Sequence, residues 1–134
     1  MKISSKGRYA VRVMAELGKH PNQYMSIASL SEKQNISVKY LEKIASMLTK
    51  ANLIESSRGA DGGYALKKKP NEYSVAQILQ ATNDLPCLAP CLNNNNNCPM
   101  HNKCDSIGCW ENLNAMIVDY LSKITLENLI NKTY

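Results

Sequence analysis

The sequence predicts a mainly α-helical fold: a winged helix-turn-helix domain with a small β-hairpin wing, followed by a long C-terminal helix. Two short amphipathic segments joined by a tight turn indicate the helix-turn-helix. A glycine-rich stretch at 57–63 between extended residues indicates the hairpin. Apolar residues at heptad spacing beyond residue 109 indicate the long helix. The 134 residues suit one domain of ordinary size with one appended element.

Apolar spacing and capping residues predict the first three helices. Between Ser5 and about Lys19, apolar residues recur at three- and four-residue steps, which is typical of a helix with one buried face. Ser26 is expected to cap a short helix that ends near Asn35, a residue that tolerates left-handed backbone. Ser37 is expected to cap the next helix. The predicted inner stripe of that helix consists of Val38, Leu41, Ile44, Ala45 and Leu48.

The hairpin is expected from the extended residues 53–56 and 64–67 on either side of the glycine-rich turn. A capping box, Ser74 with Gln77 three residues later, predicts the start of a fourth helix that fades by Asn83. Residues 85 to 109, which include the asparagine run at 93–97, are predicted to form a long loop.

The last predicted helix begins at Trp110. Its apolar residues step by four, three and four positions, which is the spacing of a heptad seam. Because this seam lies outside the basic domain, we expect it to pack against its counterpart in a second chain. Packing onto the chain's own helices is the alternative. The residues of the seam are Leu113, Ile117, Tyr120 and Ile124.

Composition and charge favour a nucleic-acid partner for the N-terminal half. Residues 1–70 hold 13 Lys and Arg against 5 Asp and Glu, a net charge of +8, whereas residues 71–134 hold 3 against 6, a net charge of −3. A basic segment suits DNA because neutralising phosphates releases counterions. No apolar run approaches the roughly 20 residues of a membrane span, and no apolar signal segment follows Met1, so we expect a cytoplasmic protein without membrane contact.

The second helix of a helix-turn-helix enters the major groove, where its outward residues reach base edges and phosphates. Ser37 and Lys39 are expected to contact phosphates. Lys43 can donate to guanine, and Glu42 can accept from cytosine N4. A merely solvated helix face is the alternative. The predicted DNA-binding residues of this helix are Ser37, Lys39, Tyr40, Glu42 and Lys43.

The wing supplies two further candidates. Arg58 precedes Gly59 on a thin turn, which places its side chain to enter a minor groove, where arginine is attracted by the negative potential. A plain hairpin turn is the alternative interpretation of the glycines.

Five cysteines lie within 23 residues, spaced Cys87-x3-Cys91-x6-Cys98-x5-Cys104-x4-Cys109. This odd number in one short segment favours reduced thiols over a disulfide framework. Zinc sites typically use two tight ligand pairs, which these spacings only approach. Iron-sulfur clusters accept wider, loop-borne thiolates. The spacing therefore favours a cluster, with zinc and free or redox-switching thiols as alternatives.

Four segments carry a family resemblance. They are MKISSKGRYAV at 1–11, SVKYLEK at 37–43, RGADGGY at 58–64, and three cysteines ahead of the helix that begins at Trp110. In this order, over nearly the whole chain, they resemble the Rrf family of winged helix-turn-helix transcription regulators. The resemblance points to its IscR-like members, with NsrR, RirA and CymR as relatives.

The resemblance implies a homodimer, built by the C-terminal helix, that binds palindromic operators on double-stranded DNA. It also implies an iron-sulfur cluster, of the 2Fe-2S rather than the 4Fe-4S type, held by Cys91, Cys98 and Cys104. Cluster occupancy would then alter the affinity for DNA. The chain divides accordingly into a winged helix-turn-helix domain at 1–83, a cluster-binding loop at 84–109, and a dimerisation helix and tail at 110–134.

The fourth ligand does not follow the family pattern. Ile107 stands where IscR-like members have a histidine, and Arg8 stands where NsrR-like members have a carboxylate. Cys109 and His101 are the local candidates, with Cys109 ahead because thiolate is the softer and commoner cluster ligand. Cys87 has no family counterpart.

These observations predict a transcription repressor, not an enzyme, that senses iron-sulfur status, redox stress or nitric oxide through a cysteine-ligated cluster. The alternative is a winged-helix repressor of cysteine or sulfur metabolism controlled by thiol oxidation, zinc or a partner protein. A small thiol oxidoreductase is a third interpretation, which the lack of a Cys-x-x-Cys motif in a βαβ context disfavours.

Overall fold

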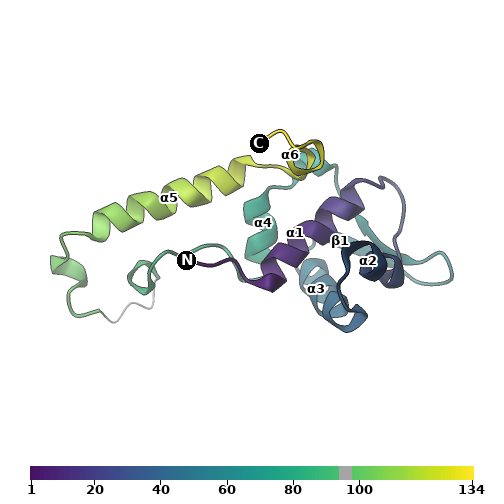
Figure 1. Ribbon diagram of the computed structural model, residues 1–134, viewed down its shortest axis with the longest axis horizontal. Coiled ribbons are helices and arrows are strands. Elements are labelled where there is room, and N and C mark those ends of the chain that lie inside the picture. The colour runs from purple at the N-terminus through teal and green to yellow at the C-terminus, as the bar shows by residue number, and fades with distance from the viewer. Residues whose placement is uncertain (94–97) are drawn as a thin grey trace.

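A computed structural model describes residues 1–93 and 98–134, so residues 94–97 of the predicted loop lie outside the described part (Figure 1). Four helices and a hairpin form the N-terminal domain, and a long helix extends away from it. The helices and strands are α1 (Ser5–Gly18), α2 (Ile27–Gln34), α3 (Val38–Lys50), β1 (Ile54–Ser57), β2 (Gly63–Leu66), α4 (Val75–Ala81), α5 (Ile107–Lys123) and α6 (Leu126–Asn131). Short 3-10 helices are η1 (Pro70–Glu72), η2 (Pro90–Leu92) and η3 (His101–Lys103).

The predicted caps of the helix-turn-helix are confirmed. Ser26 begins α2 by accepting a hydrogen bond from the Ser29 N–H. Asn35 ends α2 in the left-handed conformation, with φ of 53°. The side chain of Ser37 begins α3 by accepting from the Tyr40 N–H. Local hydrogen bonding to short polar side chains therefore sets the turn between α2 and α3.

The core lies where α1, α3 and α4 meet, and it is built largely from the predicted stripes. Met14 of α1, Ile44 of α3 and Ile78 of α4 are fully buried there. One predicted core residue is wrong: Val38 is 41% exposed. It is the first residue of α3, and at that point the helix has not yet reached the core. The remaining predicted stripe residues of α3 are Leu41, Ala45 and Leu48, all buried.

The predicted hairpin is confirmed as an antiparallel pair that runs from Ile54 opposite Leu66 to Ser57 opposite Gly63. A bridge also joins Tyr64 to Met25, just before α2, through backbone hydrogen bonds of 2.8 and 2.9 Å. Gly63 has φ of +151°, and a Cβ there would overlap the Met25 carbonyl. The backbone thus attaches the wing to the start of the helix-turn-helix.

The long helix α5 begins at Ile107, three residues before the predicted Trp110, so Cys109 lies in its first turn. Sequence reasoning missed this turn because its residues precede the apolar stripe. None of the residues of α5 is buried. Within residues 1–93 and 98–134, no helix has both the length and the apolar character needed to cross a membrane.

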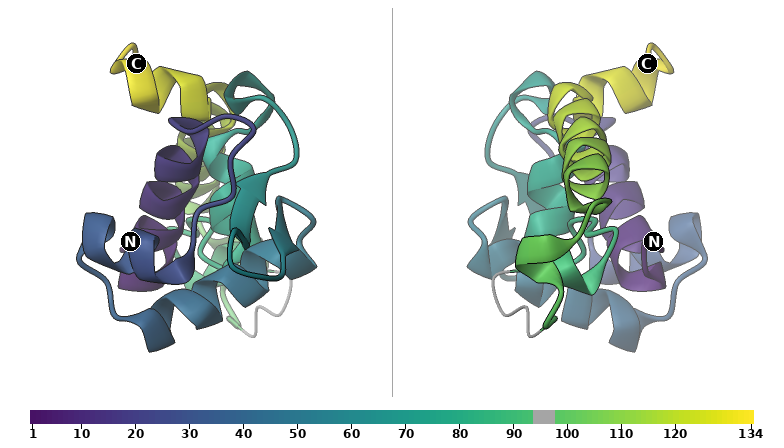
Figure 2. Two further views of the ribbon diagram at one scale, coloured as in Figure 1. Left: turned by 90° about the vertical axis from the view of Figure 1, so that its right-hand side faces the viewer. Right: turned by 90° about the vertical axis from the view of Figure 1, so that its left-hand side faces the viewer.

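The predicted C-terminal helix is interrupted. Ile124 has extended backbone, and its carbonyl accepts a hydrogen bond from the Val75 N–H. Thr125 then caps the separate helix α6 through a capping box with Asn128. Leu126 is fully buried, and α6 packs against α1 and η1 (Figure 2). Helix α6 thus packs onto the winged-helix part of the chain, whereas α5, which carries most of the predicted seam, contacts α4 and η2 and leaves Leu113 and Tyr120 largely exposed.

Candidate functional site

The exposed face of α3 carries most of the residues predicted to contact DNA. Lys39, Glu42 and Lys43 are exposed there. Ser37 is also exposed and caps α3, with its Oγ 3.2 Å from the Tyr40 nitrogen. These four side chains are brought together on one surface of the helix-turn-helix.

Tyr40 differs from the other predicted residues because its ring is half-buried. It meets the Tyr9 ring of α1 edge to face, with the ring centroids 5.8 Å apart and the planes at 89°. The Arg12 guanidinium lies 5.2 Å from the centroid of the Tyr9 ring. Tyr40 therefore links α3 to α1, and its surface towards solvent is smaller than the sequence suggested.

A polar cluster that sequence reasoning missed connects α1 to α2. Glu16 of α1 is buried and accepts a 2.9 Å hydrogen bond from the Gln34 amide. It also pairs with His20 at 3.2 Å, with Lys19 at 3.6 Å and with Lys33 at 3.7 Å. Burial raises the pKa of Glu16, but the hydrogen bond from His20 and the lysine charges outweigh burial and hold this pKa below its ordinary value. The only sequence signal was an acidic residue within an apolar helical stripe.

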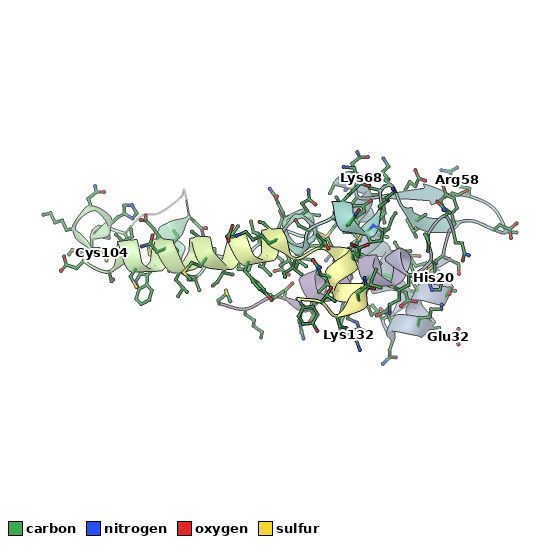
Figure 3. All side chains as sticks on the ribbon, turned by 90° about the horizontal axis from the view of Figure 1, so that it is seen from above. His20, Glu32, Arg58, Lys68, Cys104 and Lys132 are labelled. Carbon is green, nitrogen blue, oxygen red and sulfur yellow. The ribbon has the colours of Figure 1, made fainter. Side chains whose placement is uncertain are left out.

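The wing tip presents Arg58 and Gly59 to solvent. Gly59 has φ of +107°, and its carbonyl accepts a 3.0 Å hydrogen bond from the Gly62 N–H, which closes the turn. Figure 3 places Arg58 and Cys104 at opposite ends of the molecule. The wing tip and the cysteine-containing end of the chain are thus separated by the length of the molecule.

Two of the three predicted cluster ligands line one open cavity of about 760 Å³. Cys91 and Cys98 lie on its loop side together with His101, and Glu111 and Asn114 of α5 lie opposite. The lining residues are Cys91, Leu92, Asn93, Cys98, His101, Asn102, Glu111, Asn114, Ala115 and Val118.

Cys104 is not part of this lining, and it has partners of its own. Its Sγ lies 3.3 Å from the Ser106 Oγ, which accepts a 3.1 Å hydrogen bond from the Trp110 indole. Hydrogen bonds from the Ser106 hydroxyl and from the backbone at the start of α5 lower the pKa of the Cys104 thiol. The Cys104 thiol therefore ionises at a lower pH than an ordinary cysteine thiol.

The cysteine-rich segment, residues 84–109, carries the kind of ligands that an iron-sulfur cluster takes, but its described side chains do not form a ready ligand set. Thiolates on a loop are the ligands such clusters prefer, and no disulfide joins the five cysteines. Yet among the residues the structure describes, no three His, Cys, Asp or Glu side chains are close enough to hold a metal ion.

The start of this segment is anchored at two places. The Ser4 hydroxyl, at the N-cap of α1, donates a hydrogen bond to the Asp84 carboxylate. The Leu88 N–H donates to the Asn114 side chain of α5 at 2.8 Å. The segment is thereby connected both to α1 of the winged domain and to α5.

A helix-turn-helix with an exposed basic helix, a glycine-tipped wing and an appended helix defines the class of winged-helix transcription regulators, which bind DNA and are not enzymes. The particular family follows from comparison. Residues 3–132 match Rrf2, described as an iron-dependent transcriptional regulator. The chain belongs to the Rrf2 family and is an IscR-like regulator, as the sequence motifs indicated.

Individual relatives support this assignment. The transcriptional regulator IscR of Pectobacterium atrosepticum is 36% identical over 132 residues, which is 98% of this chain and 80% of that protein. The structure of CymR, the global cysteine regulator of B. subtilis, has a TM-score of 0.79 at 30% identity and covers 100% of this chain and 99% of its own. The T. potens IscR structure has a TM-score of 0.77 at 30% identity, covering 100% and 89%.

Proposed function

We propose that this regulator is a homodimeric repressor that binds palindromic operators and senses iron-sulfur status, redox stress or nitric oxide. Its proposed sensor is an iron-sulfur cluster on Cys91, Cys98 and Cys104, of the 2Fe-2S type. The observation that carries the proposal is the placement of cysteines at the far end of a helix that is connected to the winged domain. The likeness to proteins named IscR supports it.

The DNA contacts are proposed from the exposed side chains of α3 and the wing. Lys39 and Ser37 lie at the N-terminal end of α3, where backbone N–H groups also favour phosphate. Lys43 and Glu42 lie further along the exposed face, where they would read base edges. Arg58, beside Gly59, would reach the minor groove from the wing tip.

The homodimer is proposed from the unburied apolar face of α5. Large apolar side chains in such numbers are rarely left in water unless a partner covers them. A second copy of the same helix would cover them by heptad packing, and two winged domains would then meet two half-sites of a palindrome. The exposed fractions are 42% for Trp110, 42% for Leu113, 69% for Met116 and 55% for Tyr120.

Cluster binding is proposed to change the affinity for DNA through the two anchors of the cysteine-rich segment. Cys91, Cys98 and Cys104 would hold the cluster, which would supply iron-thiolate bonds between them. Closing the segment would pull on the Leu88 to Asn114 hydrogen bond and on the contact of Asp84 with Ser4. Because these anchors belong to α5 and α1, the closed segment would favour one arrangement of the winged domains over others.

The sensor is tested by purifying the full chain without oxygen. We expect a brown protein with visible absorption and stoichiometric iron and sulfide, and loss of colour when Cys91, Cys98 and Cys104 are each changed to Ala. Cys87→Ala is the matched control and is expected to keep the colour. A colourless protein that contains zinc would contradict the proposal.

The DNA contacts are tested with single substitutions and a palindromic operator selected from random duplexes. Arg58→Ala is expected to weaken binding, and Lys43→Ala is expected to change base preference more than salt dependence. Lys123→Ala, which removes a lysine of the acidic C-terminal half paired with Asp119, is the control. If both Arg58→Ala and Lys43→Ala bind as the unaltered protein does, the docking arrangement is wrong.

A second candidate function has its own support. The chain resembles CymR, described as a cysteine regulator, over its full length, and the Cys104 thiol has a lowered pKa. Under this candidate the repressor answers to thiol oxidation, zinc or a partner protein in cysteine or sulfur metabolism. This candidate predicts a colourless protein whose operator affinity changes with oxidant. It also predicts that the operator affinity of Cys104→Ser does not change with oxidant.

A further inference from the structure

We propose that the two α5 helices of the homodimer run antiparallel and that Trp110 of each copy covers an apolar groove at the C-terminal end of the partner's α5. This inference rests on the proposed function, because it concerns the same homodimer. It adds the direction of the two helices, their register, and the surface that each copy offers to the other.

The groove lies where the C-terminal end of α5 meets the winged domain. It is an open hollow of about 350 Å³, lined by side chains of α1, α4, α5 and α6 and of the residues that flank them. Val75 is buried there, Val11, Leu121 and Ile124 are half-buried, and Tyr120 is exposed. The apolar face of α5 therefore continues through this groove onto the winged domain.

A row of apolar side chains along α5 reads the same in both directions. Its positions step by three, four and three residues. In a twofold interface, residue i of one copy meets residue j of the other while j meets i, so two antiparallel copies match every member of such a row. Trp110 then faces the partner's Tyr120. Leu113 likewise faces the partner's Ile117. The members of this outer row are Trp110, Leu113, Ile117 and Tyr120.

This register carries the start of α5 onto the groove of the partner. Tyr120 lines the groove, so a Trp110 side chain that packs against it covers the mouth of the groove. Ile107, about one helical turn before Trp110, then lies beside the partner's Ile124, another lining residue. In the single chain Trp110 is 42% exposed and Tyr120 is 55% exposed. The second copy thus removes apolar surface from water on both sides of the contact.

Charge favours the same direction. Glu111 follows Trp110, Lys132 lines the groove, and both side chains are exposed. Within one chain they are held apart, because Glu111 is near the Cys104 end of α5 and Lys132 lies beyond the other end (Figure 3). Antiparallel packing brings Glu111 towards the partner's Lys132, whereas parallel helices would place Glu111 and Asp119 level with their own copies. A second copy of this chain therefore fits the groove in both shape and charge.

Photo-crosslinking of the full chain tests the arrangement. Benzoylphenylalanine replaces Tyr120 in one preparation and Tyr134, an exposed residue of the groove lining, in another. Copies labelled with ¹⁴N and ¹⁵N are mixed and irradiated, so that a link between a light and a heavy peptide joins two chains. Cleavage after Asp and Glu separates residues 106–111, 112–119 and 120–127. We expect mixed-isotope links from both positions to 106–111. Parallel helices would instead link position 120 to 120–127.

Trp110 is the only tryptophan of the chain, so its fluorescence reports on this contact alone. We expect its emission to move to longer wavelength when the protein is diluted to monomers, because the partner no longer shields the indole from water. Trp110→Ala is expected to raise the dissociation constant of the dimer at least about tenfold, measured by sedimentation. Trp110→Phe keeps an apolar ring without the indole bond to Ser106 and should weaken dimerisation less. Asn112→Ala, an exposed position on another face of α5, is the matched control and should dimerise as the unaltered protein does.

The outcomes separate this inference from the proposed function. An unaltered protein that stays monomeric overturns both. A dimer whose mixed-isotope links from positions 120 and 134 avoid residues 106–111 overturns the inference alone, and the groove then takes another protein or a small apolar ligand. A dimer that is equally stable in Trp110→Ala, or whose Trp110 emission does not change on dissociation, also overturns the inference alone.

Discussion

The ring of Tyr40 on α3 stands edge-on to the ring of Tyr9 on α1, with their centroids 5.8 Å apart. One turn along α1, Arg12 lies over the Tyr9 ring and donates hydrogen bonds to the backbone and side chain of Gln34, the last residue of α2. Adjacent side chains of α1 thus hold both helices of the helix-turn-helix. In the proposed DNA complex, the direction from which α3 enters a groove would depend on this pair of rings.

We expect Tyr9→Ala to weaken operator binding although Tyr9 is not a proposed DNA contact. An edge-to-face pair contributes about 0.5–1.5 kcal/mol beyond the buried area, so a total loss of about 1–3 kcal/mol in unfolding free energy is expected. Urea unfolding and fluorescence anisotropy with labelled operator measure the two effects. Tyr9→Phe keeps the ring and should restore both. Tyr9→Ala with unchanged affinity would show that α3 is oriented by other contacts.

The attachment of the wing gives a second prediction. Gly63→Ala places a Cβ against the Met25 carbonyl, in backbone that L-residues rarely adopt. It should break the Met25 to Tyr64 bridge and cost about 2–4 kcal/mol, with faster proteolytic cleavage of the wing. Gly59→Ala is the matched control, because a Cβ there meets nothing within 4 Å and only the φ strain of about 1–2 kcal/mol remains. Equal losses in the two variants would contradict the role of the bridge.

The elements that could be predicted from the sequence are those that local chemistry decides. Ser26, Ser37 and Ser74 each cap the helix that was expected, because a short side chain satisfies N–H groups two or three residues away. Helix α6 was missed because its signal is tertiary. Thr125 caps it locally, but the heptad seam continues up to Ile124, directly before that residue, and only the burial of Leu126 shows that the chain turns back.

The candidate site was predictable to a similar degree. The exposed face of α3 and the wing tip follow from helical period and turn chemistry, so the exposure of Lys43 and Arg58 could be predicted. The relation of Tyr40 to Tyr9 joins residues 31 positions apart and leaves no periodic trace. Cysteine spacing indicated a cluster site. It could not show which donors share a cavity with Cys91, because that depends on how the segment folds.

The buried Glu16 predicts acid sensitivity at the joint between α1 and α2. Its pKa is held below the ordinary value of 4.5, so its charged form stabilises the folded chain at higher pH. That contribution is complete above about pH 5.5 and is lost as the pH falls below 4.5 through the folded-state pKa. Glu16→Gln should lower the unfolding free energy by about 1–3 kcal/mol at pH 6, and the difference from the unaltered protein should shrink towards pH 3.

Urea unfolding at a series of pH values measures this difference. Glu32→Gln, which changes an exposed carboxylate of α2, is the matched control and should show little pH-dependent difference. If the unaltered protein and Glu16→Gln differ equally at pH 6 and at pH 3, the charge of Glu16 does not stabilise the fold.

The apolar face of α5 gives the last prediction. Met116 is 69% exposed in the single chain, so Met116→Glu removes little buried surface within it and should leave its fold intact. In a helix pair the new carboxylate would be buried without a partner, which should weaken dimerisation at least about tenfold.

Ser122→Glu introduces the same charge on the side of α5 opposite the seam of Leu113 and Tyr120, since helical residues advance by 3.6 per turn. It should remain dimeric in sedimentation velocity. Two joined winged domains bind both half-sites of a palindrome at once. Met116→Glu should therefore also lose operator affinity, while its circular dichroism stays unchanged. Should Met116→Glu sediment as a dimer, the second copy must pack on another surface, and the apolar face of α5 would serve a different partner.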